Sequence, residues 1–213
     1  LKNARVLVAG AGGLGSSVLI HLAAAGVGRI GIVDSDRVEL SNLNRQTLYS
    51  TYDIGKLKAP AAKERLELLN PGIKTEALAA LITEETVFDL VGEYPIIVDA
   101  MDNLPTRLLL NRVAVERGLP LFHGAVYGFE GRATTIIPQQ TPCLRCVYQG
   151  VLPGQIPVVG VTPAVIGCIQ ATEVIKYLIG MGDLLTNRLL LYDGIGMRFS
   201  EAKVKRDPDC KAC

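Results

Sequence analysis

Four glycines within residues 10–15 lie between a short apolar run at residues 6–9 and a helical segment that reaches about residue 25. Glycine permits a tight turn and lets a phosphate approach the backbone, and the first turn of a helix offers free N–H groups to an anion. A second buried strand is predicted at residues 29–34, which completes a βαβ unit. The pattern predicts nucleotide binding at Gly10, Gly12, Gly13 and Gly15, although a tight strand-to-helix turn alone would also use such glycines.

The alternation of strands and helices continues along the chain. Helices are predicted at residues 57–69, 84–91, 106–117 and 163–179, and Gly118 and Gly180 follow the last two. Further strands are predicted at 74–80, 96–99, 120–123, 131–137, 189–193 and 199–204. This order is typical of an α/β fold with a Rossmann-like, doubly wound and mostly parallel sheet, and the hairpin-like strands of the second half predict an antiparallel extension.

Composition and charge exclude several classes of protein. The chain has 213 residues, of which 49% are hydrophobic, and a formal net charge of +1. Such a balance gives no overall field for nucleic acid or an anionic membrane, and the hydrophobic content excludes disorder. The uncharged stretch at residues 147–172 is long enough to span a bilayer, but its prolines and glycines would break a spanning helix. No secretory signal is visible at the start, so we expect a cytoplasmic protein without membrane contact.

Polar residues after the predicted strands indicate which nucleotide the glycines would hold. Asp34 ends the second strand, where a carboxylate can accept hydrogen bonds from ribose hydroxyls. Arg45 and Lys58 follow, and transfer at an α-phosphate needs such cations because negative charge moves onto the leaving pyrophosphate. Asp102 and Asn103 follow the strand at 96–99, at the sheet edge where α/β folds bind ligands and a carboxylate can hold Mg²⁺. Taken singly, Arg45 and Lys58 could be solvated charges and Asp102 a helix N-cap.

Two C-x-x-C pairs predict a metal site. They are formed by Cys143 with Cys146 and by Cys210 with Cys213, and four thiolates suit a tetrahedral, structural Zn²⁺ with no open position. Disulfides and a redox pair are the alternatives. A chain with a large core and no visible secretory signal is a poor candidate for a disulfide framework, and a redox motif does not explain the second pair.

The other residues capable of chemistry have ordinary structural interpretations. Cys168 lies in an apolar helical run and is predicted to be an inert core thiol, His21 to pack on a helix and His123 to end a core strand. Four residues of a predicted loop after that strand could line a substrate channel: Tyr127, Phe129, Glu130 and Arg132. A simple turn around Gly128 and Gly131 is the alternative.

In their order along the chain, these motifs resemble those of the ThiF/MoeB/HesA family, the bacterial and archaeal relatives of the ubiquitin-activating (E1) enzymes. The resemblance rests on the glycine loop, Asp34-Ser35-Asp36, Ser41-Asn42-Leu43-Asn44-Arg45-Gln46, Lys58, Asp99-Ala100-Met101-Asp102-Asn103 and the two cysteine pairs. It covers essentially the whole chain and implies a single E1-like adenylation domain over residues 1–213.

The resemblance implies ATP-dependent adenylation of the C-terminal glycine of a small ubiquitin-like sulfur-carrier protein, with release of pyrophosphate. The implied cofactors are ATP, Mg²⁺ and a structural Zn²⁺. Gly13 would then lie on the phosphates, Asp34 would hold the ribose, Asn42, Arg45 and Lys58 would contact the phosphates, and Asp102 would bind Mg²⁺. Arg45, Lys58 and Asp102 are accordingly the predicted catalytic residues. The carboxylate is itself the nucleophile, so positioning and charge stabilisation suffice for this step.

The family also implies partners. Its members are similar in forming homodimers that receive the tail of a β-grasp carrier ending in Gly-Gly. In these relatives an N-terminal arm carries an Arg to the ATP of the partner subunit. This sequence begins at Leu1, shortly before the first predicted strand. Relatives that bind sulfur covalently often have a Cys where this sequence has Ile156, so we expect adenylation alone, with sulfur from a separate protein. Two alternatives remain: an NAD-binding oxidoreductase and a non-catalytic E1-like partner subunit.

Overall fold

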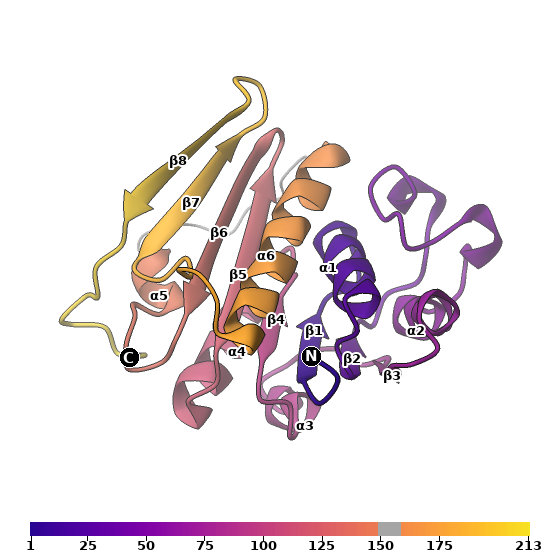
Figure 1. Cartoon of the computed structure of the whole chain (residues 1–213), viewed down its shortest axis with the longest axis horizontal. Coiled ribbons are helices and arrows are strands. Elements are labelled where there is room, and N and C mark those ends of the chain that lie inside the picture. Colours follow the sequence, from indigo (N-terminus) through magenta and orange to yellow (C-terminus); the bar gives the residue numbers. More distant parts are fainter. Residues whose placement is uncertain (149–158) are drawn as a thin grey trace.

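A computed structural model describes residues 1–148 and 159–213. The described residues form one sheet of eight strands in the order β3-β2-β1-β4-β5-β6-β7-β8 (Figure 1). The parallel strands are β1 (Arg5–Ala9), β2 (Arg29–Val33), β3 (Lys74–Leu78), β4 (Ile97–Asp99) and β5 (Leu121–Tyr127). The antiparallel strands β6 (Glu130–Ile136), β7 (Arg188–Asp193) and β8 (Arg198–Lys203) extend the sheet beyond β5. The predicted parallel sheet with an antiparallel extension is therefore confirmed.

Helices cover both faces of the sheet. One face carries α1 (Gly13–Ala24), α2 (Lys58–Leu69) and α6 (Val161–Ile179), and the other carries α3 (Val87–Val91), α4 (Leu104–Arg117) and the short α5 (Leu144–Val147) (Figure 1). Two further single turns, η1 (Leu40–Asn42) and η2 (Thr51–Asp53), lie between β2 and α2. Of these helices, none is long and apolar enough to cross a membrane.

Alternation along β1 explains how the two faces bury their side chains. Val6 and Val8 face the helices α1, α2 and α6, whereas Leu7 and Ala9 face α3 and α4. Successive residues of a strand point to opposite faces, so a strand buried on both sides must be apolar throughout. The four residues are at most 1% exposed, and such continuous apolar runs identify the parallel strands in the sequence.

Local signals mark both ends of the helix α4. Asn103 is its N-cap, and its side-chain oxygen accepts a hydrogen bond from the Thr106 N–H at 2.9 Å, with Pro105 in the first turn. Gly118 ends the helix in the left-handed conformation, with φ of 66°. The helix begins two residues before the predicted start at 106, because Asn103 and Pro105 form the cap and first turn.

The predicted turn at Gly128 is present, but the longer loop that would include Tyr127, Glu130 and Arg132 is not. The strand β5 continues to Tyr127 and β6 begins at Glu130, so only Gly128 and Phe129 form the turn. Gly131 lies inside β6. A glycine is needed there because a Cβ would lie 2.4 Å from the side chain of Ile166 on α6. The second glycine therefore serves close helix-to-sheet packing rather than a turn.

His123 does not end a strand as predicted. It lies in the middle of β5 and is completely buried. His21, predicted to pack on a helix, is exposed on α1. The uncharged stretch at residues 147–172 lies partly outside the described residues, and α6 begins within it at Val161.

Candidate active site

A pocket of about 900 Å³ lies at the carboxyl ends of the parallel strands. The strand order reverses between β1 and β4, and the loops that follow these two strands diverge there, which is where open α/β sheets bind ligands. Of the predicted nucleotide-binding residues only Gly15 is missing from its lining, which includes Gly10, Gly12, Gly13, Asp34, Asn42, Arg45, Lys58, Asp102 and Asn103. The structure thus brings together side chains from four separate segments of the sequence.

The glycine loop has two different physical requirements for glycine. Gly10 has a φ of 97°, and a Cβ there would lie 2.6 Å from the Ala100 carbonyl oxygen. A Cβ on Gly15 would lie 2.0 Å from the Gly10 carbonyl oxygen, so this glycine allows α1 to pack closely on the loop. A Cβ on Gly12 would meet nothing closer than 3.6 Å. Gly10 and Gly15 therefore serve the fold, whereas Gly12 leaves the pocket wall open.

Asp34 is held by the backbone at the rim of the pocket. Its carboxylate accepts hydrogen bonds from the N–H groups of Ala11 and Asp36, both at 2.8 Å. Partial burial raises the pKa of Asp34, and the two N–H groups oppose that shift by favouring the charged form. The first bond ties Asp34 directly to the glycine loop, so the two predicted elements of nucleotide binding form one unit.

The predicted cations converge on the pocket. The Lys58 side chain is 7% exposed, and its Nζ lies 2.9 Å from the Asp36 Oδ2. Arg45 is half-buried and donates from Nη1 to the Ser41 carbonyl oxygen at 3.1 Å and to the Asn44 Oδ1 at 3.0 Å. The interpretation of Lys58 as a solvated charge is wrong, because the fold buries it against the pocket.

Asp102 is exposed on the loop between β4 and α4. Its carboxylate accepts a hydrogen bond from the Asn103 side chain at 3.3 Å. The alternative in which Asp102 caps α4 is wrong, because Asn103 is the N-cap. Asn42, by contrast, is buried and accepts from the Glu39 N–H at 3.1 Å through its Oδ1. Asp102 therefore does not cap α4, and it lines the pocket.

Sequence reasoning assigned no role to three polar residues that line the pocket. Asp36 pairs with Lys58, and the repeated acid two residues after Asp34 was a signal for it. Gln46 is 3% exposed, and its Oε1 has no hydrogen-bond partner within the described structure. Arg107 is 7% exposed and lies one helical turn after the cap Asn103, a spacing that puts both on one face of α4.

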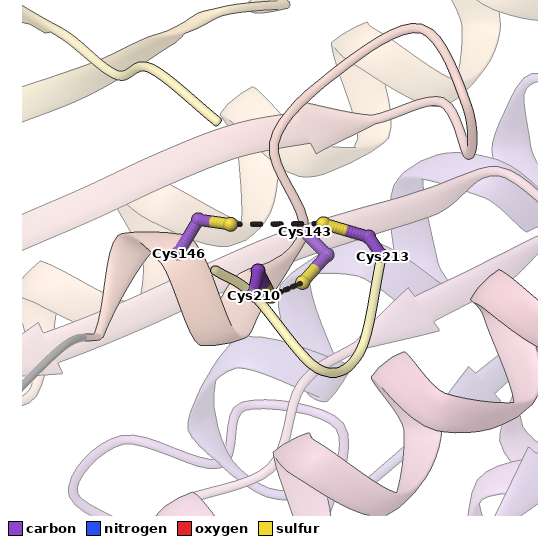
Figure 2. Close-up of side chains that lie close together, drawn as sticks. All are labelled: Cys143, Cys146, Cys210 and Cys213. Atoms are coloured by element: carbon purple, nitrogen blue, oxygen red, sulfur yellow. Dashed lines mark hydrogen bonds between the residues drawn. The ribbon is translucent and has the colours of Figure 1, made fainter. Parts of the chain in front are cut away.

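The four predicted cysteine ligands meet in one cluster (Figure 2). All four Sγ atoms lie within 4.8 Å of one another, although Cys210 and Cys213 come from the end of the chain. The Cys143–Cys210 and Cys146–Cys213 sulfur distances are 3.8 Å and 3.6 Å. A disulfide requires about 2.05 Å, whereas a tetrahedron with Zn–S bonds of ~2.3 Å requires sulfurs about 3.8 Å apart. The cluster therefore fits a four-coordinate zinc ion.

Cys168 is not the core thiol that the sequence predicted. It is half-buried on α6, with its Sγ 3.3 Å from the Ser17 hydroxyl and 3.8 Å from the nearer ring nitrogen of His21 on α1. The apolar neighbours of Cys168 in the sequence do not determine which face of the helix it occupies. Ile156, the position at which the family resemblance implies a Cys in sulfur-binding relatives, lies outside the described residues.

Comparison with known proteins identifies the family. The ThiF family model matches residues 1–212. The sulfur carrier protein adenylyltransferase of Thermus thermophilus is 45% identical, covering 100% of this chain and 83% of that protein. The SAMP-activating enzyme E1 of Haloferax volcanii is 44% identical, covering 100% and 81% respectively. The crystal structure of E. coli MccB with ATP has a TM-score of 0.88 at 26% identity and covers 100% of this chain and 67% of that one. The chain belongs to the ThiF family.

Proposed function

We propose that this chain is an ATP-dependent adenylyltransferase that activates the C-terminal glycine of a ubiquitin-like sulfur-carrier protein. A carboxylate oxygen of that glycine attacks the α-phosphorus of ATP, the bond from this phosphorus to the bridging oxygen breaks, and pyrophosphate leaves. The products are the acyl-adenylate and pyrophosphate, with no redox change. The observation that carries the proposal is the convergence of the glycine loop, Asp34, Arg45, Lys58 and Asp102 on one pocket.

The glycine loop and the rim would hold the nucleoside end of ATP and its phosphates. Gly12 and Gly13 precede and begin α1, which has no side-chain cap among the described residues, so its first N–H groups could bind phosphate oxygens. Asp34 would accept from the ribose hydroxyls with the lone pairs that the Ala11 and Asp36 N–H groups leave unused. Together these contacts would orient the α-phosphorus toward the arriving carboxylate.

The cations would stabilise the charge that develops on pyrophosphate. Asp36 already orients the buried Lys58 ammonium, and two hydrogen bonds restrain the Arg45 guanidinium. Groups that are fixed before the reaction need no reorganisation when charge moves onto the leaving group. The buried Asn42 would add a neutral hydrogen bond to the phosphates. No protein nucleophile is needed, because the substrate supplies its own carboxylate.

Asp102 and Asn103 are the residues that would face a magnesium ion bound to the phosphates. Mg²⁺ prefers carboxylate oxygens and usually binds through one or two of them together with substrate phosphates and water. When bound, it would neutralise phosphate charge and so ease attack on the α-phosphorus. The exposed carboxylate of Asp102 retains most of its lone pairs for that purpose, since its hydrogen-bond partner is the Asn103 amide.

The two relatives named for sulfur-carrier or SAMP activation support a carrier substrate for this chain. We infer a β-grasp carrier ending in Gly-Gly, as membership of the ThiF family implies. Residues 1–213 would act as one adenylation domain within a homodimer. The four cysteines would hold a structural Zn²⁺ that joins the end of the chain to α5. The cytoplasmic location stays a prediction.

Carrier-dependent exchange of labelled pyrophosphate into ATP tests the proposal. Purified chain, Mg·ATP and a Gly-Gly-ended carrier from the same genome are expected to support exchange. The same carrier lacking its terminal glycine is the matched control and should give none. A parallel titration with NAD⁺ separates the oxidoreductase alternative, and binding of NAD⁺ without exchange would contradict the proposal. A non-catalytic partner subunit would bind carrier without exchange, which would contradict it as well.

A further inference from the structure

A chain of buried hydrogen bonds begins at Asp99, the residue before the pocket-lining segment 100–103. Asp99 ends β4 and His123 lies beside it on β5, and both are completely buried. The His123 Nδ1 lies 2.6 Å from the Asp99 Oδ2, and its Nε2 lies 2.7 Å from the Tyr148 hydroxyl. The rings of His123 and Tyr148 pack edge to face with centroids 5.4 Å apart. None of these three side chains has a direct role in the proposed reaction.

Burial determines the direction of both hydrogen bonds. Desolvation lowers the pKa of His123, so the ring is neutral and has one N–H donor and one acceptor nitrogen. The Asp99 carboxylate accepts, so Nδ1 donates to it and Nε2 is the acceptor. With Nε2 as the acceptor, the Tyr148 hydroxyl is the donor in the second hydrogen bond. Without that hydroxyl, the buried Nε2 would lose its partner.

Asp99 and Arg107 form hydrogen bonds with the backbone N–H and carbonyl groups of Met101, the residue before Asp102. The Asp99 Oδ1 accepts from the Met101 N–H at 3.1 Å, and the Arg107 Nη2 donates to the Met101 carbonyl oxygen at 2.6 Å. Arg107 also lies against the Asp99 carboxylate, with Nε 3.8 Å from Oδ2. A shift of the Asp99 carboxylate would therefore move the backbone from which Asp102 projects.

The other end of the hydrogen-bond chain lies at the cysteine cluster. Tyr148 directly follows α5, which has Cys143 as its N-cap and contains Cys146. The Leu144 N–H of the same helix donates to the buried Asn111 side chain on α4 at 2.8 Å. Thus α5 contacts the support of the Asp102 loop twice, through His123 and through α4. A metal that fixes α5 would fix both contacts.

We propose that His123 and Tyr148 are positioning residues for Asp102, and that they link metal binding by the four cysteines to Mg·ATP binding in the pocket. This inference rests on the proposed function, because it assigns Mg·ATP to that pocket. Linkage is reciprocal, so Mg·ATP must strengthen zinc binding by the same factor by which zinc strengthens Mg·ATP binding. The zinc ion then contributes to substrate binding as well as to stability.

Tyr148→Phe tests the link, because the variant keeps the packed ring and removes only the hydroxyl. Its matched control is Tyr177→Phe, which alters another edge-to-face tyrosine, packed on Phe122 at 5.8 Å. In zinc-loaded protein, calorimetry should show that Mg·ATP binds about fivefold more weakly to Tyr148→Phe than to the wild type, a factor at the lower end of typical allosteric couplings. Binding to Tyr177→Phe should be unchanged. Binding of ATP without added Mg²⁺ should be the same in all three proteins, because the effect acts through Asp102.

Zinc retention provides a second readout that does not depend on activity. A chromophoric zinc chelator is titrated into each protein with and without saturating Mg·ATP. Mg·ATP should raise the chelator concentration needed for half removal about fivefold in the wild type and Tyr177→Phe, and less than twofold in Tyr148→Phe. Equal Mg·ATP affinity and equal zinc retention in Tyr148→Phe and wild type would overturn the link while leaving the proposed function intact. A wild-type chain that does not bind Mg·ATP would overturn the proposed function itself.

Discussion

Lys58 and Asp36 form an ion pair at the pocket wall, with the Lys58 Nζ 2.9 Å from the Asp36 Oδ2. The lysine side chain is 7% exposed, whereas that of the aspartate is 68% exposed. The Asp36 N–H also donates to Asp34, so one short loop after β2 orients both the carboxylate that we propose for the ribose and the cation that we propose for the phosphates. The site is therefore organised before any nucleotide enters, which is the condition for effective electrostatic catalysis.

Lys58→Ala is expected to weaken Mg·ATP binding by about tenfold to 100-fold, because a charge-assisted hydrogen bond contributes ~1.5–3 kcal/mol. Calorimetric titration measures the change. Lys56→Ala is the matched control, since Lys56 lies two residues earlier and makes an exposed pair with Asp53 at 2.8 Å outside the pocket lining. Similar losses in both variants would show that general positive charge, rather than the position of Lys58, supports binding.

Two alanine substitutions in the glycine loop are expected to change different properties, the stability of the fold in one case and ATP binding in the other. Gly15→Ala should lower the free energy of unfolding by about 2 kcal/mol or more, because the added Cβ would overlap the Gly10 carbonyl oxygen at 2.0 Å. Gly12→Ala should leave stability within ~1 kcal/mol, since its Cβ meets only the Gln46 amide at 3.6 Å. That methyl group would nevertheless narrow the pocket and weaken ATP binding. Urea unfolding and calorimetry of the pair measure both effects, and the reverse order would contradict the assignment.

Removal of one cysteine ligand is expected to lower thermal stability. Cys213→Ser leaves an incomplete zinc site and frees the end of the chain from α5, and a loss of about 2–3 kcal/mol corresponds to a Tm lower by ~5–10 °C in a chain of this size. Cys168→Ser removes the remaining cysteine, which lies outside the cluster, and should retain both zinc and Tm. Calorimetry with metal analysis tests this pair. An unchanged Tm in Cys213→Ser protein shown to lack zinc would exclude a structural role.

Acid should destabilise the fold through His123. Its pKa is lowered by burial in the folded state, whereas in the unfolded chain it is about 6.5. Below about pH 6.5 the unfolded state therefore binds a proton that the folded state does not, and the free energy of unfolding falls as pH falls, by up to ~1.4 kcal/mol per pH unit. Urea unfolding at pH 7.5, 6.5 and 5.5 should show a flatter dependence in His123→Asn. The exposed His21 gives the control variant His21→Asn, and a flatter curve in that variant instead would contradict this assignment.

Much of the fold was predictable because its signals are local. Buried parallel strands are continuous apolar runs, and caps such as Asn103 and Gly118 mark helix ends within two residues. Gly131 was correctly placed in a predicted strand, at 131–137, but the reason for a glycine there is tertiary and was missed: Ile166, 35 residues later, occupies the space that a side chain would need. A position can require glycine for its backbone conformation or for close packing by a neighbour, and only the folded structure shows which of the two reasons applies.

The candidate site was predictable where chemistry dictates the residue type. Asp34, Arg45, Lys58 and Asp102 carry charges that the proposed reaction needs, and all four line the pocket. The support beneath them was not predictable in the same way. The contact of Asp99 with His123 depends on the pairing of β4 with β5, and the contact of His123 with Tyr148 depends on where the chain places α5. Such residues serve the site through other residues, so their types alone do not reveal them.

Mass analysis of the carrier after reaction tests the central claim most directly. The chain is incubated with Mg·ATP and a Gly-Gly-ended carrier, with pyrophosphatase to remove the product, and the intact carrier is weighed. The expected result is a carrier heavier by one adenylate at its terminal glycine, formed by the wild type and lost in Asp102→Ala, which should keep the wild-type Tm because its carboxylate is exposed and does not cap α4. An unmodified carrier with the wild-type chain, or equal modification by Asp102→Ala, would contradict the account.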